Sequence, residues 1–377
     1  MGMHEWAALL LLAPLATAAA CGGSSDESPE SGGTAGTAGS GATAGTDAGS
    51  GGAGGANTGG VAGSGAAAGS GGAPFSGVAG CGATPPPGAA QPDPLPSYAG
   101  TCPALVAGSN TIQSSGNDRK FMLALPADPK PGEVFPVVFL WHWLGGDAQG
   151  FYDKGEIQAA VDTQRFVAVL PEKKGDVLFT WPVEGVQSQA RVDEELAFFD
   201  DMLACVGSEL TVNESCVSSV GVSAGALWTD ILAHERSTHL SSFISLSGGV
   251  GGVIRPWKSA PHKLPGIVLW GGPTDNCAGL LKFEDISHTL EDELIKDGHF
   301  FVECVHNCGH SEPPFAGPAG YSKYKGLWDF VLDHPYWLAP GESPYSGGLP
   351  ADMPEWCGIG KDSATPRTGV CDNPSQC

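Results

Sequence analysis

The stretch CVSSVGVSAGALW, residues 216 to 228, decides the fold. It opens with an apolar, β-branched run typical of a buried strand, and an amphipathic helical pattern begins at Gly225. GVSAG between them has the spacing of a sharp strand-to-helix turn that presents a serine above a sheet. Glycines suit positions 221 and 225 because side chains there would collide with neighbouring backbone. The stretch therefore predicts Ser223 as a nucleophile.

Similar strand patterns recur on either side of this stretch. Apolar or aromatic runs predict strands at residues 121–125, 134–141, 165–171, 243–249, 266–272 and 299–305, and helical patterns lie at 193–207, 225–236, 280–298 and 321–334. Continuous apolar strands alternating with helices predict an α/β fold with a mostly parallel sheet flanked by helices. In such sheets the chemistry lies at the carboxyl ends of the strands.

The remaining segments give the domain organisation. Residues 1–21 contain an apolar run, at 6–21, that is too short for a comfortable membrane span, and AAAC before Gly22 resembles a bacterial lipobox. We therefore expect a signal peptide ending at a lipidated Cys21, although Ala18 and the absence of basic residues depart from that pattern; plain cleavage or an uncut anchor are the alternatives. Residues 22–80 predict a disordered Gly/Ala/Ser/Thr-rich tether. We expect a Pro-rich collar at 81–114, a catalytic domain at 115–340 and a cysteine-containing C-terminal extension at 341–377.

The charge balance excludes one class of partner. The chain has 18 Lys plus Arg against 41 Asp plus Glu, a formal charge of −23, which would repel a phosphate backbone. Nucleic acid is therefore not an expected partner. Because no Lys or Arg precedes Arg119, any membrane contact of the N-terminal arm should be covalent or hydrophobic.

The cysteines indicate an oxidising compartment. Eleven are present, and removing Cys21 for lipid leaves ten (11 − 1), an even number that favours several disulfides. We expect one disulfide between Cys205 and Cys216, which bracket a short turn, and leave the other pairings open. The segment CVHNCGH offers zinc ligands in Cys304, His306, Cys308 and His310, but it lacks a second CxxC pair. Disulfides are therefore the favoured interpretation, and no metal is expected.

A serine nucleophile needs a base and an acid that orients the base. Asp275 follows the strand pattern GIVLW, and His310 follows HFFVECV, so both fall past strand ends in the order Ser, Asp, His. His306 competes for the role of base, but it lies within the strand pattern. Asp230, Asp285 and Asp292 fall in helical patterns, where solvated carboxylates are the default expectation.

The negative charge that develops in acyl transfer needs two backbone donors. One should be the amide of Ala224, directly after the serine. The other should come from HWLGGD after the strand at 134–141, with Leu144 as the candidate. Trp141, Trp143 and Trp181 fall near the predicted rim of the site, where they would offer faces to an aromatic or hydrophobic acyl group.

These features together resemble the polyhydroxybutyrate depolymerase and feruloyl esterase family of secreted α/β-hydrolases. The resemblance covers about residues 115 to 335 and rests on PVVFLWHWLGGDA, RVDEELAFFDDML, GVSAG, WGGPTD and CGH. It implies Ser223 as nucleophile, Asp275 as acid, His310 as base and the HWLGG loop as part of the oxyanion hole. The chain departs from the family at Trp143, where glycine is usual, and at Gly271, where histidine is usual.

From this we expect an exported serine esterase, anchored in the bacterial cell envelope or secreted. Its substrates would be oligomeric or polymeric esters, either hydroxyalkanoate-type polyesters or feruloyl and acetyl esters on polysaccharides. No cofactor is expected, and the protein should be a monomer. Two alternatives stay open: an inactive surface binding module on the same fold, motivated by Trp143 and the tether, and a serine peptidase or thioesterase.

Overall fold

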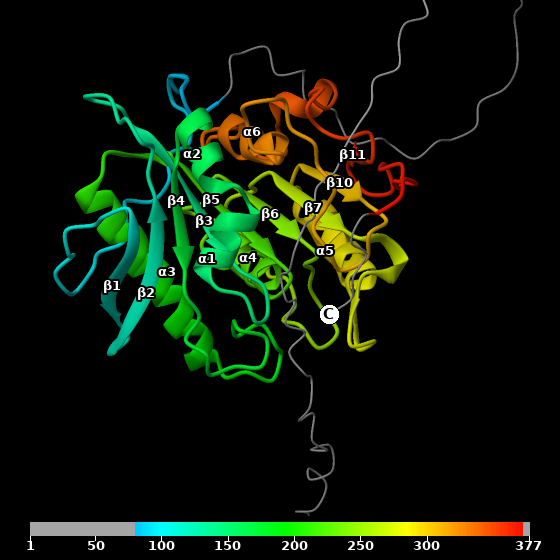
Figure 1. The fold of residues 1–377 in the computed structure, drawn as a ribbon, viewed down its shortest axis with the longest axis horizontal. Helices are drawn as coiled ribbons and strands as arrows, with labels where there is room; N and C mark the ends of the chain where they lie inside the picture. The colour runs from blue at the N-terminus through cyan, green and yellow to red at the C-terminus, as the bar shows by residue number, and fades with distance from the viewer. Residues whose placement is uncertain (1–79, 372–377) are drawn as a thin grey trace, which may run out of the picture. The chain divides into compact units, whose positions relative to one another are not determined.

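A computed structural model describes residues 80–371 of the chain. Within this part the strands form a nine-stranded sheet in the order β1-β2-β4-β3-β5-β6-β7-β10-β11 (Figure 1). The central strands run parallel: β4 (Val167–Pro171), β3 (Phe135–Trp141), β5 (Val212–Val222), β6 (Ser242–Leu246), β7 (Gly266–Trp270) and β10 (Phe301–Val305). The predicted mostly parallel sheet is confirmed.

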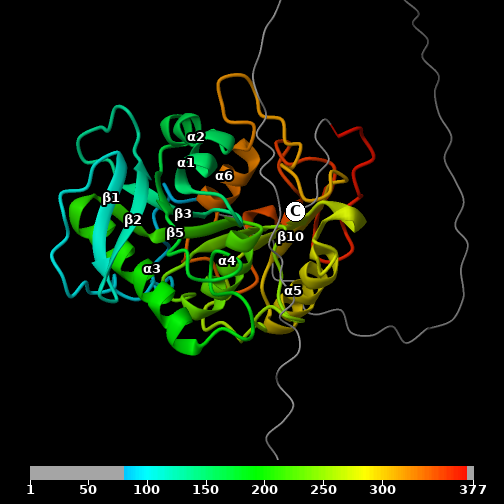
Figure 2. The same cartoon turned by 60° about the horizontal axis from the view of Figure 1, so that its bottom comes forward.

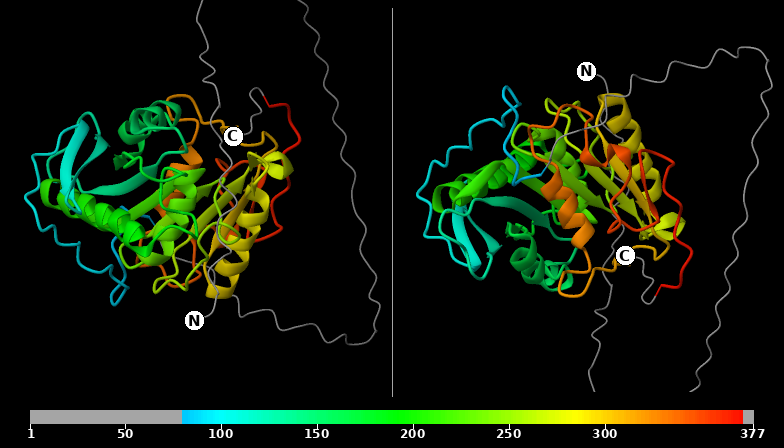
Figure 3. Two further views of the ribbon diagram at one scale, coloured as in Figure 1. Left: turned by 90° about the horizontal axis from the view of Figure 1, so that it is seen from below. Right: turned by 90° about the horizontal axis from the view of Figure 1, so that it is seen from above.

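Helices cover both faces of the sheet (Figures 2 and 3). One face carries α3 (Gln189–Glu209), α4 (Ala224–Glu235) and α5 (Phe283–Asp297), and the other carries α1 (Ala148–Lys154), α2 (Ile157–Gln164) and α6 (Lys325–Asp333). Successive strand side chains point to opposite faces of the sheet. Phe139 therefore packs in the core under α3, α4 and α5, and Leu140 packs in the core under α1, α2 and α6. Every residue of β3 is buried, which explains its continuous apolar sequence.

Antiparallel strands complete both edges of the sheet. At one edge β1 (Gly108–Ser114) forms a hairpin with β2 (Asn117–Ala124), and at the other β11 (Cys357–Ile359) pairs with β10. The hairpin turn at Ser115 and Gly116 has positive φ at both residues, as a two-residue loop requires. β1 lies in the predicted collar and β11 in the predicted extension, so the folded region is wider than the predicted 115–340.

Short elements follow the main strands. A two-stranded ribbon of β8 (Asn276–Cys277) and β9 (Leu281–Lys282) comes after β7, and 3₁₀ turns occupy Gly272–Thr274 and Pro344–Gly347. The predicted signal peptide, Cys21 and the predicted tether up to residue 79 lie outside the described residues. None of the helices between residues 80 and 371 is long and apolar enough to cross a membrane.

Four disulfides join described residues: Cys81–Cys216, Cys102–Cys205, Cys304–Cys357 and Cys308–Cys371. The predicted Cys205–Cys216 pair is wrong. Cys205 is buried in α3 and Cys216 is buried within β5, and each bonds a cysteine of the segment that precedes β1. Although the two cysteines are close in sequence, they lie on different elements, and each forms its disulfide with another cysteine.

Candidate active site

Ser223 lies at the turn between β5 and α4, in the conformation that the sequence pattern predicts. Its φ is 55° and its ψ is −119°, a strained backbone for a residue with a side chain. A Cβ at Gly221 would lie 2.0 Å from the carbonyl oxygen of Gly225, and one at Gly225 would lie 1.9 Å from that of Trp141. Glycine at 221 therefore allows the start of α4 to fold back over the turn, and glycine at 225 allows it to pack against β3.

Three side chains from three loops meet at this turn. His310 Nε2 lies 2.8 Å from Ser223 Oγ, and His310 Nδ1 lies 2.7 Å from Asp275 Oδ1. The three residues follow β5, β7 and β10, whose carboxyl ends share one edge of the sheet. The structure thus brings the serine, the histidine and the aspartate together in the spatial order expected of nucleophile, base and acid.

Three further residues hold this arrangement, and two of them, Ser247 and Phe283, were not predicted from the sequence. Asp275 is 1% exposed, and its Oδ2 accepts hydrogen bonds of 2.7 Å from Ser247 Oγ and from the amide of Gly271. The ring of Phe283 stacks on His310 with centroids 4.5 Å apart. Ser247 directly follows β6 and therefore lies at the same sheet edge, a position that could have identified it.

His306, the competing candidate for the base, is not the histidine that bonds Ser223 and Asp275. His306 is fully buried, its Nδ1 accepts a 3.1 Å hydrogen bond from the amide of Cys308, and burial lowers its pKa to about 4. Cys304 and Cys308 are both in disulfides, so the zinc interpretation of this segment loses two of its ligands.

The alternative acids lie on helices, away from the histidine. Asp285 and Asp292 are on α5, and Asp292 pairs with Lys361. Asp230 corrects a prediction, because it is completely buried in α4 and not solvated. Its Oδ2 accepts hydrogen bonds from Ser245 Oγ at 3.0 Å and from the amide of Gly249 at 2.7 Å, and burial raises its pKa to about 8.

The two predicted oxyanion donors lie next to the serine and on the loop after β3. Ala224 is the first residue of α4, so its amide has no acceptor within the helix. Leu144 lines the same cavity as Ser223, and within residues 80–371 we find no hydrogen-bond acceptor for its amide. Two hydrogen bonds hold the loop after β3. His142 Nδ1 donates to the carbonyl of Trp143, and Trp181 Nε1 donates to the carbonyl of His142.

The three predicted aromatic contacts separate into two kinds. Trp141 and Trp181 are wholly buried and pack edge to face with centroids 5.1 Å apart, so they support the loop and do not line the site. Their prediction as substrate contacts is wrong, because both rings lie inside the core. Trp143 does line the cavity, and its ring packs near Phe151, 6.3 Å between centroids.

The cavity beside Ser223 has a volume of about 1010 Å³. Trp143 and four further aromatic side chains line it: Phe151, Phe315, Tyr324 and Trp328. Glu312 on the rim pairs with Lys154 at 3.0 Å and with Lys323 at 3.3 Å. The site is therefore an aromatic-walled cleft with a charged entrance, large enough for a drug-sized or oligomeric ligand.

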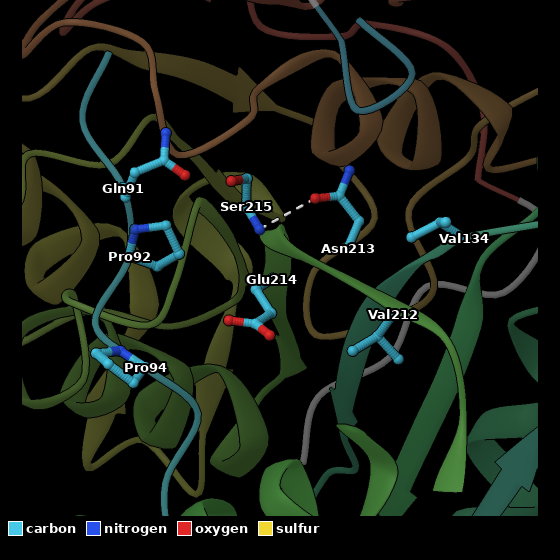
Figure 4. A pocket seen from close by; sticks show the side chains of 8 residues that line it. All are labelled: Gln91, Pro92, Pro94, Val134, Val212, Asn213, Glu214 and Ser215. Carbon is cyan, nitrogen blue, oxygen red and sulfur yellow. Dashed lines mark hydrogen bonds between the residues drawn. The ribbon is translucent and has the colours of Figure 1, made fainter. Parts of the chain in front are cut away.

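A second hollow of about 430 Å³ lies at the opposite end of β5 (Figure 4). Val212 and Asn213 open that strand, and Asn213 Oδ1 accepts a 3.1 Å hydrogen bond from the amide of Ser215. An eleven-residue strand spans roughly 35 Å, so this hollow is remote from Ser223.

Comparison with known proteins finds sequence similarity to feruloyl esterases. No family model matches the chain. Feruloyl esterase C of Emericella nidulans is 26% identical over 152 residues, covering 40% of this chain and 53% of that protein. Feruloyl esterase D of Neurospora crassa is 26% identical over 166 residues, covering 41% and 57%. The chain thus spans about half the length of the curated relatives it matches.

Two solved structures have a fold similar to that of this chain. The native protein called sOPH superposes with a TM-score of 0.56 at 18% identity, covering 70% of this chain and 99% of its own. The native protein called pOPH gives a TM-score of 0.56 at 16% identity, covering 69% and 97%. The resemblance expected from the sequence is confirmed: the chain has the α/β-hydrolase fold and is similar in sequence to the feruloyl esterases.

Proposed function

We propose that the chain is a serine carboxylic ester hydrolase. The observation that carries the proposal is the contact of His310 with Ser223 on one side and with Asp275 on the other, at 2.8 and 2.7 Å, beside an aromatic-walled cavity. Sequence similarity to feruloyl esterases supports ester chemistry over the peptidase alternative, which the three side chains alone would also serve.

The proposed reaction follows from these contacts. Ser223 Oγ attacks the ester carbonyl carbon while its proton passes to His310 Nε2, and Asp275 stabilises the imidazolium. The amides of Ala224 and Leu144 donate to the oxyanion. The intermediate collapses by breaking the bond to the alcohol, which leaves with the proton from His310. A water then gives a proton to His310 Nε2 and attacks the acyl carbon. The bond from the acyl carbon to Ser223 Oγ breaks, Oγ takes the proton back from His310, and the acid is released.

The cavity lining supports a substrate class. Five aromatic rings and two lysines suit a large acyl group with an aromatic or extended apolar body, such as a feruloyl ester on a polysaccharide or a hydroxyalkanoate oligomer. The relatives' names favour the feruloyl ester. Trp143, which replaces the family's glycine, forms part of the wall that would contact the acyl group.

The test is hydrolysis by the oxidised full chain, with Ser223→Ala beside it. The substrates are methyl ferulate, a hydroxybutyrate trimer and p-nitrophenyl esters from acetate to octanoate. We expect turnover that falls by about 10⁵-fold in the variant, together with phosphonate labelling of the wild-type chain alone. A folded wild-type chain that shows neither turnover nor labelling would be a binding module, and equal turnover in Ser223→Ala would exclude the proposed nucleophile.

We further propose that the enzyme is exported and anchored through a lipid on Cys21. Four disulfides support an oxidising compartment, and the AAAC segment supports the anchor. The chain expressed in a bacterium with the lipoprotein pathway should partition into detergent, and Cys21→Ser should release it. Unchanged membrane retention of that variant would refute the lipid.

A further inference from the structure

A histidine and three carboxylates converge away from the active site, where the C-terminal segment packs against α5 and β10. One ligand atom each from His288, Glu303 and Asp362 lies within 4.8 Å of the other two. Glu291 adjoins them, with its Oε2 2.9 Å from His288 Nδ1. His288 and Glu291 are three residues apart on α5, a spacing that places both on one helix face.

Two of these carboxylates are buried, and one of them has an oxygen without a partner among the described residues. Glu303 is 2% exposed and Glu291 is fully buried. The oxygens of Glu303 accept hydrogen bonds from the amides of Asp362 at 3.0 Å and Ala364 at 2.7 Å. Glu291 Oε1 has no hydrogen-bond partner in the part of the chain that the structure describes.

The nearby cation does not balance this charge. Lys361 pairs with Asp292, a fourth carboxylate, so negative groups outnumber positive ones around the cluster. Buried carboxylates without a counter-charge are costly, which leaves a role for a bound cation.

We propose that His288, Glu291, Glu303 and Asp362 bind one divalent transition metal ion, with Zn²⁺ as the best match. The imidazole nitrogen favours a transition metal such as Zn²⁺, which also accepts carboxylate oxygens, over calcium and magnesium, which favour oxygen ligands alone. The side chain of His288 is 33% exposed and Asp362 is exposed, so the ion has an open path of entry. None of the four lines the cavity at Ser223.

The ion would act as a clamp. Its ligands come from α5, from β10 and from the loop after β11, so binding would fasten the C-terminal segment to the sheet edge beside the disulfide Cys304–Cys357.

The test is calorimetric titration of Zn²⁺ into the untagged, oxidised full chain after treatment with EDTA, with Ca²⁺ and Mg²⁺ as comparison ions. We expect one Zn²⁺ per chain, no binding of the other two, and a rise in melting temperature of about 5 °C at saturating Zn²⁺.

Two variants and a control locate the ion. Asp362→Asn keeps a residue that tolerates the φ of 58° at this position, and His288→Gln removes the imidazole. Both should weaken Zn²⁺ binding at least about tenfold, whereas Glu293→Gln on the same helix should bind like wild type. No binding by wild type, or equal binding by all three variants, would overturn the proposal. Ester turnover is not a readout, so failure here leaves the proposed function untouched.

Discussion

At the scale of single residues, the orientation of Asp275 is the feature that most directly limits the proposed chemistry. Its Oδ1 faces His310, and its Oδ2 is held by Ser247 and by the amide of Gly271. A carboxylate fixed at both oxygens keeps the imidazole in one tautomer and one orientation. Ser247 is therefore a positioning residue, acting on the reaction through Asp275.

Ser247→Ala should lower kcat about tenfold with KM unchanged, because it removes a hydrogen bond worth about 1.4 kcal/mol at a charged acceptor. Ester kinetics measure the effect. Ser245→Ala is the matched control: it lies on the same strand end, but its hydroxyl donates to Asp230 and not to Asp275. An equal fall in kcat in both variants would show that strand packing, and not the hold on Asp275, is responsible.

Asp230 predicts a pH dependence of stability. Its folded pKa of about 8 lies above the ordinary value of 3.8, so the folded state binds a proton that the unfolded state has lost between these values. The stabilisation is complete below pH 4 and is lost as pH rises toward 8. The unfolding free energy of the wild-type protein should fall between pH 5 and 7.5. In Asp230→Asn this fall should be smaller by up to about 3 kcal/mol.

Urea unfolding of wild type and Asp230→Asn at both pH values measures this. Glu291, whose pKa is also raised, contributes equally to both proteins and cancels in the comparison. An unchanged pH dependence in the variant would mean that Asp230 is ionised in the folded state.

At the scale of elements, the active site depends on backbones that approach too closely for side chains. The loop before Asp275 touches the loop before His310 at Gly271, where a Cβ would lie 1.9 Å from the carbonyl oxygen of Gly309. The histidine that the sequence resemblance leads us to expect at this position therefore does not fit this backbone. Here Gly271 also contributes its amide to Asp275.

Gly271→Ala should lower kcat at least about 100-fold, because the methyl group must push away the peptide that precedes His310. Gly185→Ala is the control, since its Cβ would meet no atom closer than 3.5 Å. Circular dichroism and melting temperature separate a displaced loop from an unfolded chain. Full activity of a folded Gly271→Ala would show that the two loops move apart freely.

An element-level motif of the sequence proves structural. RVDEELAFF supplies Arg191 and Glu195 of α3, and the fully buried Glu195 bonds both Arg191 and Arg119 of β2. Arg191 also pairs with Asp176 in the loop after β4. This ion-pair network ties α3 to β2 and to the loop after β4, so Arg191 and Glu195 of this motif have a structural role.

At the scale of the whole molecule, the sequence predicted the parallel strands, α3 to α6 and the meeting of Ser223, Asp275 and His310. These depend on local patterns: apolar runs, helical spacing and residues that directly follow strands. It did not predict β1, because the sequence GSNTIQS contains no apolar run. It did not predict β11, because this three-residue strand is defined by its pairing with β10, which is distant in sequence. The disulfide prediction failed for a similar reason, since Cys102 and Cys205 are 103 residues apart.

The long disulfides lead to the last prediction. The segment before β1 has few regular hydrogen bonds of its own, and Cys81 and Cys102 fasten it to β5 and α3 across 135 and 103 residues. Closing loops of this length in the unfolded chain removes entropy worth about 4 to 5 kcal/mol for each bond.

Cys102→Ser with Cys205→Ser should lower the unfolding free energy by about 3 kcal/mol or more. The kcat should stay near the wild-type value, because neither sulfur lines the cavity at Ser223. Urea unfolding and ester kinetics on the same preparations measure both quantities. A fall in kcat in a variant that remains folded would instead mean that α3 transmits strain to the turn that carries Ser223.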